Sequence, residues 1–190
     1  MANTVQYGMV IDTTRCMGCQ TCVVSCKVSN HTPEGLYWGR VRSLDGEVVY
    51  QPTGTFPEVK LAFRAELCNH CATPLCFANC PTGAIAKREE DGAVVVDDEV
   101  CIGCGTCAKA CPYEIPQIDE AAKKASKCDL CYRKVAVGGT PWCVESCPGE
   151  ARIFGDLNDP GSDVAKYIVD RKATQLHEDF GTGPSVYYVV

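Results

Sequence analysis

Two stretches of the chain share a pattern in which a short apolar run turns polar just before a cysteine. Residues 9–16 read MVIDTTRC and residues 94–101 read VVVDDEVC. Apolar and β-branched residues that give way to acidic and polar ones are typical of a strand that leads into a loop. We therefore expect a strand followed by a cysteine-rich loop at both places. The repetition indicates the duplication of a small unit.

Other patterned segments predict short elements around these loops. GAIA at 83–86 and AVVV at 93–96 are joined by the acidic turn REEDG, which predicts a β-hairpin. In TCVVSCK and TCAKACP the two cysteines stand four positions apart, which predicts short helical turns with both cysteines on one side. GSDVAKYIVDRKA, residues 161–173, predicts a helix with Ser162 or Asp163 as its N-cap.

The remaining segments predict less regular structure. Residues 27–67 form an insertion that carries Pro33, Pro52, Pro57 and several glycines, for which we expect strands and loops and no third domain. The closing SVYYVV predicts either an extended edge strand or a segment docked on a partner.

Composition narrows the chemistry to metal binding. The chain has 190 residues, 16 cysteines and a formal net charge of −6. Its first residues show neither the basic nor the apolar region of a secretory signal, so we expect folding in a reducing compartment where disulfides do not form. No apolar run reaches the roughly 18 residues of a membrane span. Scattered lysines and arginines argue against nucleic acid as a partner.

The cysteines fall into four groups of four with none left over. The first and third groups share the spacing C-x2-C-x2-C-x3-C, whereas the second has x4 and the fourth x11 in its middle gap. In order along the chain the groups are Cys16, Cys19, Cys22 and Cys26; Cys68, Cys71, Cys76 and Cys80; Cys101, Cys104, Cys107 and Cys111; and Cys128, Cys131, Cys143 and Cys147.

This spacing favours iron–sulfur clusters over zinc or disulfides. Structural zinc uses two C-x2-C pairs a dozen or more residues apart, and cysteines separated by two residues form strained disulfides. Three closely spaced cysteines followed by a fourth and a proline are the run of two-cluster ferredoxins, in which the fourth cysteine binds the other cluster. Cys80, Cys111 and Cys147 precede proline, whereas Cys26 precedes Lys27. The groups thus predict four [4Fe–4S] clusters, and spacing alone leaves open which fourth cysteine serves which trio.

The chain resembles a known family along nearly its whole length. CMGCQTCVVSCK, CNHCATPLCFANCPTGAI, CIGCGTCAKACPYEIP, KCDLCYRK and FGDLNDP together are similar to the four-cluster iron–sulfur subunit of molybdopterin oxidoreductases. This family includes the electron-transfer subunits of dimethyl sulfoxide reductase and polysulfide reductase. The resemblance includes the unusual middle gaps of the second and fourth groups, and it departs from the proline pattern only after Cys26.

The resemblance implies a pairing of groups one and four and of groups two and three. Each trio then takes its fourth ligand from the paired group. The implied ligand sets are Cys16, Cys19 and Cys22 with Cys147; Cys128, Cys131 and Cys143 with Cys26; Cys68, Cys71 and Cys76 with Cys111; and Cys101, Cys104 and Cys107 with Cys80.

The expected fold is α+β, with duplicated two-cluster ferredoxin-like units built from short hairpins and helices. One unit comprises residues 1–26 and 128–155, and the other comprises residues 68–127. The insertion at 27–67 and a C-terminal tail at 156–190, packed on the core or on a partner, complete the chain.

The implied function is conduction of electrons. The family's partner is a large catalytic subunit with a molybdenum or tungsten bis-pterin cofactor, in some systems with a quinone-linked membrane anchor. A freestanding polyferredoxin that shuttles electrons between enzymes is the alternative, against which the insertion and the tail argue. The sequence itself shows no free cysteine nucleophile, G-x-G-x-x-G or P-loop, so we expect no active site, small-molecule substrate or nucleotide. We expect a chain that folds in the cytoplasm and stays there, or crosses the membrane folded with a twin-arginine-bearing partner.

Two further features concern residues beside the cysteines. Lys123, Lys124 and Lys127 precede group four; they are either solvated surface residues or cations that raise the reduction potential of a neighbouring cluster. His70 lies between Cys68 and Cys71, where a full cysteine set leaves it a packing or hydrogen-bonding role in place of iron ligation.

Overall fold

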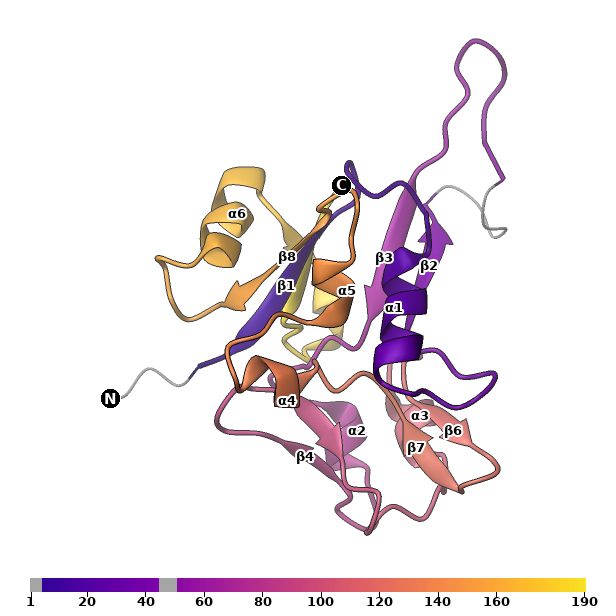
Figure 1. The fold of residues 1–190 in the computed structure, drawn as a ribbon, viewed down its shortest axis with the longest axis vertical. Coiled ribbons are helices and arrows are strands. Elements are labelled where there is room, and N and C mark those ends of the chain that lie inside the picture. Colours follow the sequence, from indigo (N-terminus) through magenta and orange to yellow (C-terminus); the bar gives the residue numbers. More distant parts are fainter. Residues whose placement is uncertain (1–4, 45–50) are drawn as a thin grey trace.

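Both ends of the protein meet in a four-stranded sheet of order β8-β1-β10-β9 (Figure 1). The computed structural model describes residues 5–44 and 51–190. β1 (Tyr7–Asp12) pairs in parallel with β10 (Val186–Val189) and antiparallel with β8 (Arg152–Asp156), and β9 (Thr174–Gln175) forms the far edge. The closing segment is therefore an interior strand, so the prediction of an edge strand was wrong: β9 covers its free side.

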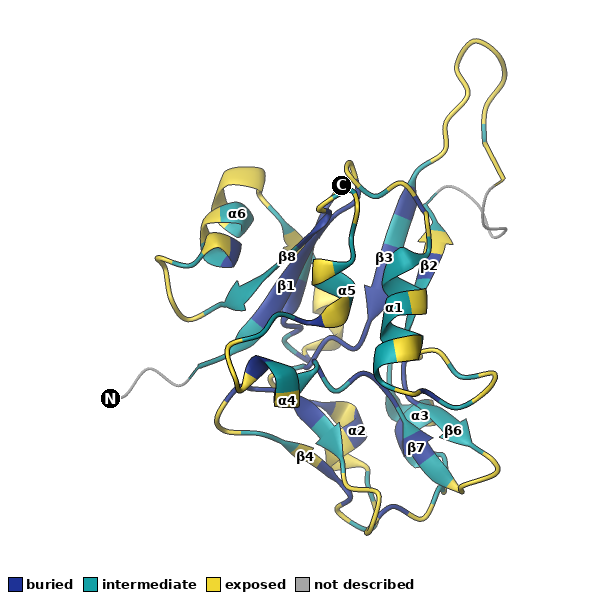
Figure 2. Ribbon diagram, viewed as in Figure 1, coloured by how far each residue is buried: buried dark blue, intermediate teal, exposed yellow. Residues whose placement is uncertain are grey.

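β1 is buried on both faces, as its nearly continuous apolar run requires. Met9 and Ile11 lie in a core shared with β2 (Gly39–Ser43) and β3 (Phe63–Leu67). Val10 packs on the other side against Val164 of α6 (Asp163–Arg171). The sheet is thus the middle layer between α6 and the β2–β3 hairpin, and the dark-blue strands at the centre of Figure 2 mark this core.

The predicted C-terminal helix is confirmed as α6, with Ser162 as its N-cap. The Ser162 hydroxyl accepts a hydrogen bond from the backbone N–H of Ala165 at 3.2 Å, which satisfies one of the free donors of the first turn. The tail from residue 156 therefore packs on the core of its own chain through α6 and β10.

The two predicted helical turns differ in length because a proline follows one of them and a lysine occupies the equivalent position in the other. α1 spans Thr21–Ser29, whereas α3 spans Thr106–Ala110. Pro112 forces Cys111 into an extended conformation (φ −79°, ψ 114°) and so ends α3. Lys27 stands at the equivalent place after Cys26, and α1 continues; the Lys27 ammonium then donates to the carbonyls of Pro33 (2.8 Å) and Leu36 (3.0 Å) beyond the helix.

Groups two and three lie in a region of small hairpins at the other end of the molecule (Figure 1). The predicted hairpin is confirmed by antiparallel β4 (Ile85–Lys87) and β5 (Val94–Val96). A second hairpin of β6 (Gln117–Asp119) and β7 (Lys124–Ser126), which was not predicted from the sequence, leads into group four. The short helices are α2 (Leu75–Ala78), α4 (Tyr132–Val135), α5 (Trp142–Glu145) and the 3-10 turn Glu178–Phe180.

The insertion begins with the end of α1, up to Ser29, which was not expected; after it the antiparallel pair β2–β3 and loops agree with the expectation. Within 27–67, residues 45–50 lie outside the described part of the chain. Residues 51–62 project away from the body at the end of the molecule that carries the first cysteine loop (Figure 1), and Phe56 is 92% exposed there. Among the residues that the structure describes, no helix has the length and apolar character needed to cross a bilayer.

Candidate metal centres

Three cysteine sets each surround a cavity, and each set contains one cysteine from a distant group. We name a site after the group that supplies its trio. Site one is lined by Cys16, Cys19, Cys22 and Cys147. Site two is lined by Cys68, Cys71, Cys76 and Cys111. Site four is lined by Cys26, Cys128, Cys131 and Cys143, with Cys22 at its border.

The remaining cysteines gather as site three. Cys101 and Cys107 lie in one buried cluster with Cys80 packed against it. Cys104 interacts electrostatically with both Cys80 and Cys107, so it lies near the other three. All 16 cysteines thus lie in four groupings whose members are those of the sets that the resemblance implies.

Strand pairing explains how the distant cysteine reaches sites one and three. Cys16 follows β1 and Cys147 precedes β8, and the antiparallel register Ile11↔Arg152 brings these two strand ends together. The same arrangement recurs at site three: Cys101 follows β5, Cys80 precedes β4, and Ile85 pairs with Val96.

Contacts between helices bring the distant cysteine to sites four and two. α1, which carries Cys26, packs against α5, which carries Cys143. α3 ends at Cys111 and packs against α2, which carries Cys76. The two halves of the molecule therefore use one strand pair and one helix pair each to assemble two sites.

The loops of the first and third groups have the same backbone turns. Gly18 and Gly103 have φ of 72° and 67°, and the residues before the helices, Gln20 and Gly105, have φ of 63° and 74°. A Cβ at Gly18 would come within 2.7 Å of the Phe63 ring, and a Cβ at Gly103 within 2.4 Å of the Lys123 carbonyl oxygen. Glycine is therefore required at the third position of each loop.

Five of the 16 cysteines are buried and nine are half-buried, and burial opposes the ionisation of a thiol. Burial raises the pKa of Cys128 well above its usual value and raises the pKa of Cys26 and of Cys76 to about 12. Since metal ligands must be thiolates, binding at these sites releases protons, and the positive charge of the metal compensates the charge that is left.

Two cysteines differ from most of the others in their exposure and in the pKa of their thiols. Cys19 of site one and Cys104 of site three are the exposed members of the 16. The thiols of Cys19 and Cys104 donate hydrogen bonds to the hydroxyls of Thr21 at 3.3 Å and Thr106 at 3.4 Å, and hydrogen bonding with these threonines lowers the pKa of both thiols. Sites one and three therefore reach the surface, and each exposed sulfur has a threonine hydroxyl within hydrogen-bond distance, which can donate to the sulfur once it is a ligating thiolate.

His70 connects site two with site four. Its imidazole is buried, and burial, followed by the charges of Lys127 and Lys87, lowers its pKa well below the usual value, so the ring is neutral. Nδ1 accepts the Val94 N–H at 2.9 Å, which leaves the proton on Nε2, 3.6 Å from the sulfur of Cys128. The expected hydrogen-bonding role of His70 is confirmed, and its acceptor, the sulfur of Cys128, belongs to the fourth cysteine group.

Buried positive charge shows that the sites suit an anionic iron–sulfur group. Arg152 and Lys127 are 6% and 4% exposed, and within residues 5–44 and 51–190 neither forms an ion pair with a carboxylate. Arg152 Nη1 lies 3.7 Å from the sulfur of Cys143, and Lys127 Nζ lies 3.9 Å from the sulfur of Cys68. Because an isolated buried cation is costly, both positions favour a negatively charged occupant. In the same part of the chain, no three His, Cys, Asp or Glu side chains are grouped so as to hold a single metal ion.

Comparisons with known proteins agree with this chemistry. Residues 59–157, more than half of the chain, match the family model of a 4Fe-4S dicluster domain, and residues 13–29 match a 4Fe-4S binding domain. The sequence is 38% identical to a putative iron-sulfur subunit of dimethyl sulfoxide reductase from Halobacterium salinarum, over 96% of this chain and 78% of that protein. It is 41% identical to a subunit of tetrathionate reductase from Salmonella typhimurium (97% and 72%). It is 45% identical to a component of the anaerobic dimethyl sulfoxide reductase of Escherichia coli (82% and 76%).

This chain therefore belongs to the ferredoxin-type iron–sulfur subunits of molybdopterin oxidoreductases. As an iron–sulfur subunit it transfers electrons through 4Fe–4S clusters. Its small mixed α and β structure is compatible with ferredoxin-like domains.

Arg152 and Asn30, like Thr21 and Thr106, contact cysteine sulfurs of this iron–sulfur subunit and were not predicted from the sequence. Arg152 lies five residues beyond Cys147 in a strand, and nothing in its sequence context marks it as buried. Asn30, just after α1, places Nδ2 3.4 Å from the sulfur of Cys26 and 3.9 Å from that of Cys131. Of the three lysines before group four, Lys123 is exposed and Lys124 half-buried, whereas Lys127 is buried, so of the two alternatives the solvated surface position is wrong for Lys127.

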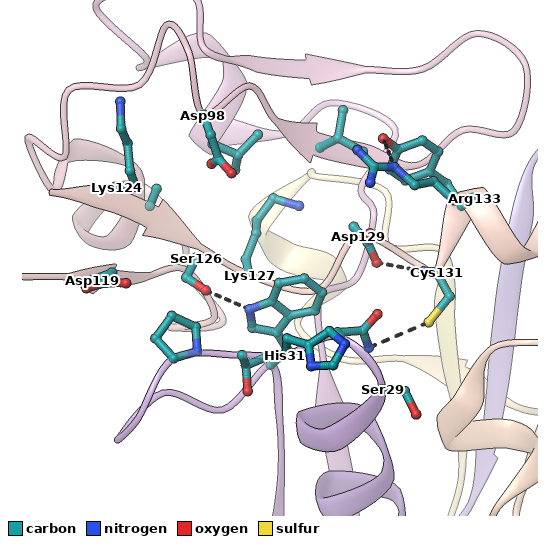
Figure 3. Close-up of a pocket in the computed structure, with 18 of the residues that line it drawn as sticks. Ser29, His31, Asp98, Asp119, Lys124, Ser126, Lys127, Asp129, Cys131 and Arg133 are labelled. Carbon is teal, nitrogen blue, oxygen red and sulfur yellow. Dashed lines mark hydrogen bonds between the residues drawn. The ribbon is translucent and has the colours of Figure 1, made fainter. Parts of the chain in front are cut away.

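A larger cavity of about 620 Å³ opens beside site four (Figure 3). The end of α1, the β6–β7 hairpin and α4 form its walls. Trp38 donates to the Ser126 hydroxyl at 2.7 Å, and the Asp129 carboxylate accepts the Cys131 N–H at 2.8 Å. Its lining mixes cations with carboxylates, so its charge favours no single class of ligand.

The two exposed sulfurs provide a matched test of the loops. We expect Thr21→Val to lower the reduction potential of the site-one cluster and Thr106→Val to lower that of site three, each leaving the other unchanged. A hydrogen bond to a ligating sulfur stabilises the more negative, reduced cluster, and valine removes the donor at nearly constant shape. Redox titration followed by electron paramagnetic resonance measures both potentials. Equal shifts at both sites in either variant would contradict the assignment.

Proposed function

We propose that the chain holds four [4Fe–4S] clusters and conducts electrons through them between a catalytic subunit and a second redox partner. The observation that supports this most strongly is the grouping of all 16 cysteines into four sets, three of them around cavities. Each trio then takes its fourth ligand from the other half of its pair: Cys147 at site one, Cys26 at site four, Cys111 at site two and Cys80 at site three.

The repeated arrangement supports two units with a common origin. One unit comprises sites one and four, from residues 1–26 and 128–155, of which residues 1–4 lie outside the described chain. The other comprises sites two and three, from residues 68–127. The equivalent strand pairs β1–β8 and β5–β4 and helix pairs α1–α5 and α3–α2 favour duplication of one ancestral cluster pair.

The contacts between sites order them as one, four, two, three. Cys22 borders the cavities of both sites one and four. The thiol of Cys128 in site four interacts with that of Cys68 in site two. Cys76 of site two lies in the same buried cluster as Cys101 and Cys107 of site three. A bound cubane accepts and releases one electron, and the protein holds successive sites next to one another while apolar side chains exclude water.

The ends of this order coincide with the exposed sulfurs and with exposed apolar side chains. Met17, Val24 and Val28 are 56%, 58% and 67% exposed around the loop and helix of site one. At the other end the exposed apolar side chains are Val100 and Ile102 at the loop of site three, with Leu75 and Phe77 of α2 beside Cys76 of site two. Apolar surface next to a redox centre favours a fixed protein partner, so we assign one docking face to each end.

The relatives supply the nature of these partners. Those named above are subunits of reductases of dimethyl sulfoxide and tetrathionate. We assign the site-one end to a large catalytic subunit with a molybdenum or tungsten bis-pterin cofactor, because residues 51–62 project from the same end and extend that face. A quinone-linked membrane anchor or another redox protein takes the site-three end.

Metal analysis tests the cluster number. We expect close to 16 iron and 16 acid-labile sulfide per chain after anaerobic purification, since four complete cubane sets bind about four irons each. Zinc should be negligible. Stoichiometric zinc, or iron near four per chain, would refute the assignment.

Replacement of a fourth ligand tests the pairing. In Cys111→Ser the cluster at Cys68, Cys71 and Cys76 should change its paramagnetic signal or lose an iron, because Cys111 lines that cavity. The neighbouring trio of Cys101, Cys104 and Cys107 should keep its signal. Loss at the neighbouring trio instead would reverse the pairing; Cys80→Ser is the matched control, with the effect expected at site three.

Hydrogen exchange tests the docking face. We expect the catalytic subunit to protect amides within residues 16–60, which include the site-one loop and part of the projecting segment. Residues 163–171 of α6, on the far side of the sheet, serve as the internal control and should exchange as in the isolated chain. An unchanged profile, together with fast reduction of several unrelated acceptors, would favour the freestanding shuttle.

A further inference from the structure

Arg152 stands between sites one and four. It lines the cavities of both sites from its position at the start of β8. Its guanidinium lies 3.7 Å from the sulfur of Cys143 in site four and hydrogen-bonds the sulfur of Cys22 in site one. The Met9 sulfur, 3.4 Å from Nη1, completes its surroundings. One fixed positive charge therefore faces sulfurs of two successive sites.

Lys127 occupies the equivalent place between sites two and four. Its ammonium lies 3.9 Å from the sulfur of Cys68 in site two and donates at 2.9 Å to the carbonyl of Cys128, a residue of site four. A further hydrogen bond to the Val94 carbonyl fixes its position. The nearest acidic group that acts with it is Asp129, whose carboxylate accepts the Cys131 N–H and forms no ion pair with Lys127 at the salt-bridge distance.

The third contact between successive sites holds no such charge. Ala84, Ile85, Val94 and Ala125 fill the cluster that joins Cys76 to Cys101 and Cys107. Among the described residues, Arg152 and Lys127 are the two lysine or arginine side chains that are buried. Lys124 donates to the Cys101 carbonyl at 2.6 Å and Lys87 to the Cys71 carbonyl at 3.1 Å, but both are only half-buried, so water screens their charges.

We propose that Arg152 and Lys127 are positioning residues that each raise the reduction potentials of the two clusters they separate. A nearby cation stabilises the reduced cluster, which carries one more negative charge, and the dry surroundings keep this attraction strong. Site four faces both charges, sites one and two face one each, and site three faces neither. The reduction potential of site four is then raised most, so an added electron is most stable at the sites in the middle of the series. The inference rests on the four clusters proposed above.

Two charge-removing variants test the pattern. In Arg152→Gln the potentials of sites one and four should fall, and in Lys127→Gln those of sites two and four should fall. Site three should stay within error of the wild type in both. Arg133→Gln is the matched control, since Arg133 is a cation on the surface two residues from Cys131 and its loss should change none of the four potentials. Anaerobic redox titration of the full chain, followed by electron paramagnetic resonance, measures each potential.

The outcomes separate this inference from the cluster assignment. Iron content of the wild type decides the number of clusters before any variant is made. With four clusters present, a shift confined to one site, a uniform shift of all four, or no shift would overturn the proposal. If a glutamine variant loses clusters, the charge-conserving variants Arg152→Lys and Lys127→Arg decide. Retention of all clusters with potentials near those of the wild type shows that the positive charge is needed. Loss of clusters in these variants shows that the shape of the side chain matters, and it overturns the proposal.

Discussion

The interior of this protein depends on two buried positive charges that form no ion pair with a carboxylate in the described part of the chain. Arg152 and Lys127 are buried between cysteine sets, with Arg152 3.7 Å from the sulfur of Cys143 and Lys127 3.9 Å from the sulfur of Cys68. Burying such cations is unfavourable unless negative charge is placed beside them. Neutral thiols, which burial favours in the absence of metal, do not provide it. Thiolate-bound clusters provide this negative charge. We therefore expect the binding of the clusters to stabilise the core of the protein.

The sheet and the helix pairs solve the geometric part of that problem. β1 is held between β8 and β10, so the first cysteine loop starts from the most buried strand and Cys147 returns beside it. The neutral imidazole of His70 then ties the second loop to the fourth through Cys128. Loops that would be irregular on their own are thus fixed at their ends by strands, at their turns by Gly18 and Gly103, and at their sulfurs by hydrogen bonds.

Much of this could be predicted from sequence because local rules act strongly here. Cysteine spacing, the proline after Cys111 and the apolar run before Cys16 each restrict the chain within a few residues. The prediction for the closing strand was wrong because β pairing is non-local: SVYYVV carries no mark of β9, which covers its outer side. Arg152 was missed for the same reason, since its burial depends on a register with Ile11 far away in sequence. In sequence, Lys127 resembles its exposed neighbour Lys123. Its burial depends on the Val94 carbonyl and the Cys68 sulfur, which come from distant parts of the chain.

Iron positions in an anaerobic crystal of the cluster-loaded protein test the account most directly. An anomalous difference map recorded at the iron edge should show four separate peaks, in the order of sites one, four, two and three. The terminal peaks should lie beside Cys19 and Cys104, and Arg152 should lie between the first two. Fewer than four peaks, or two peaks sharing one cysteine set, would contradict the account.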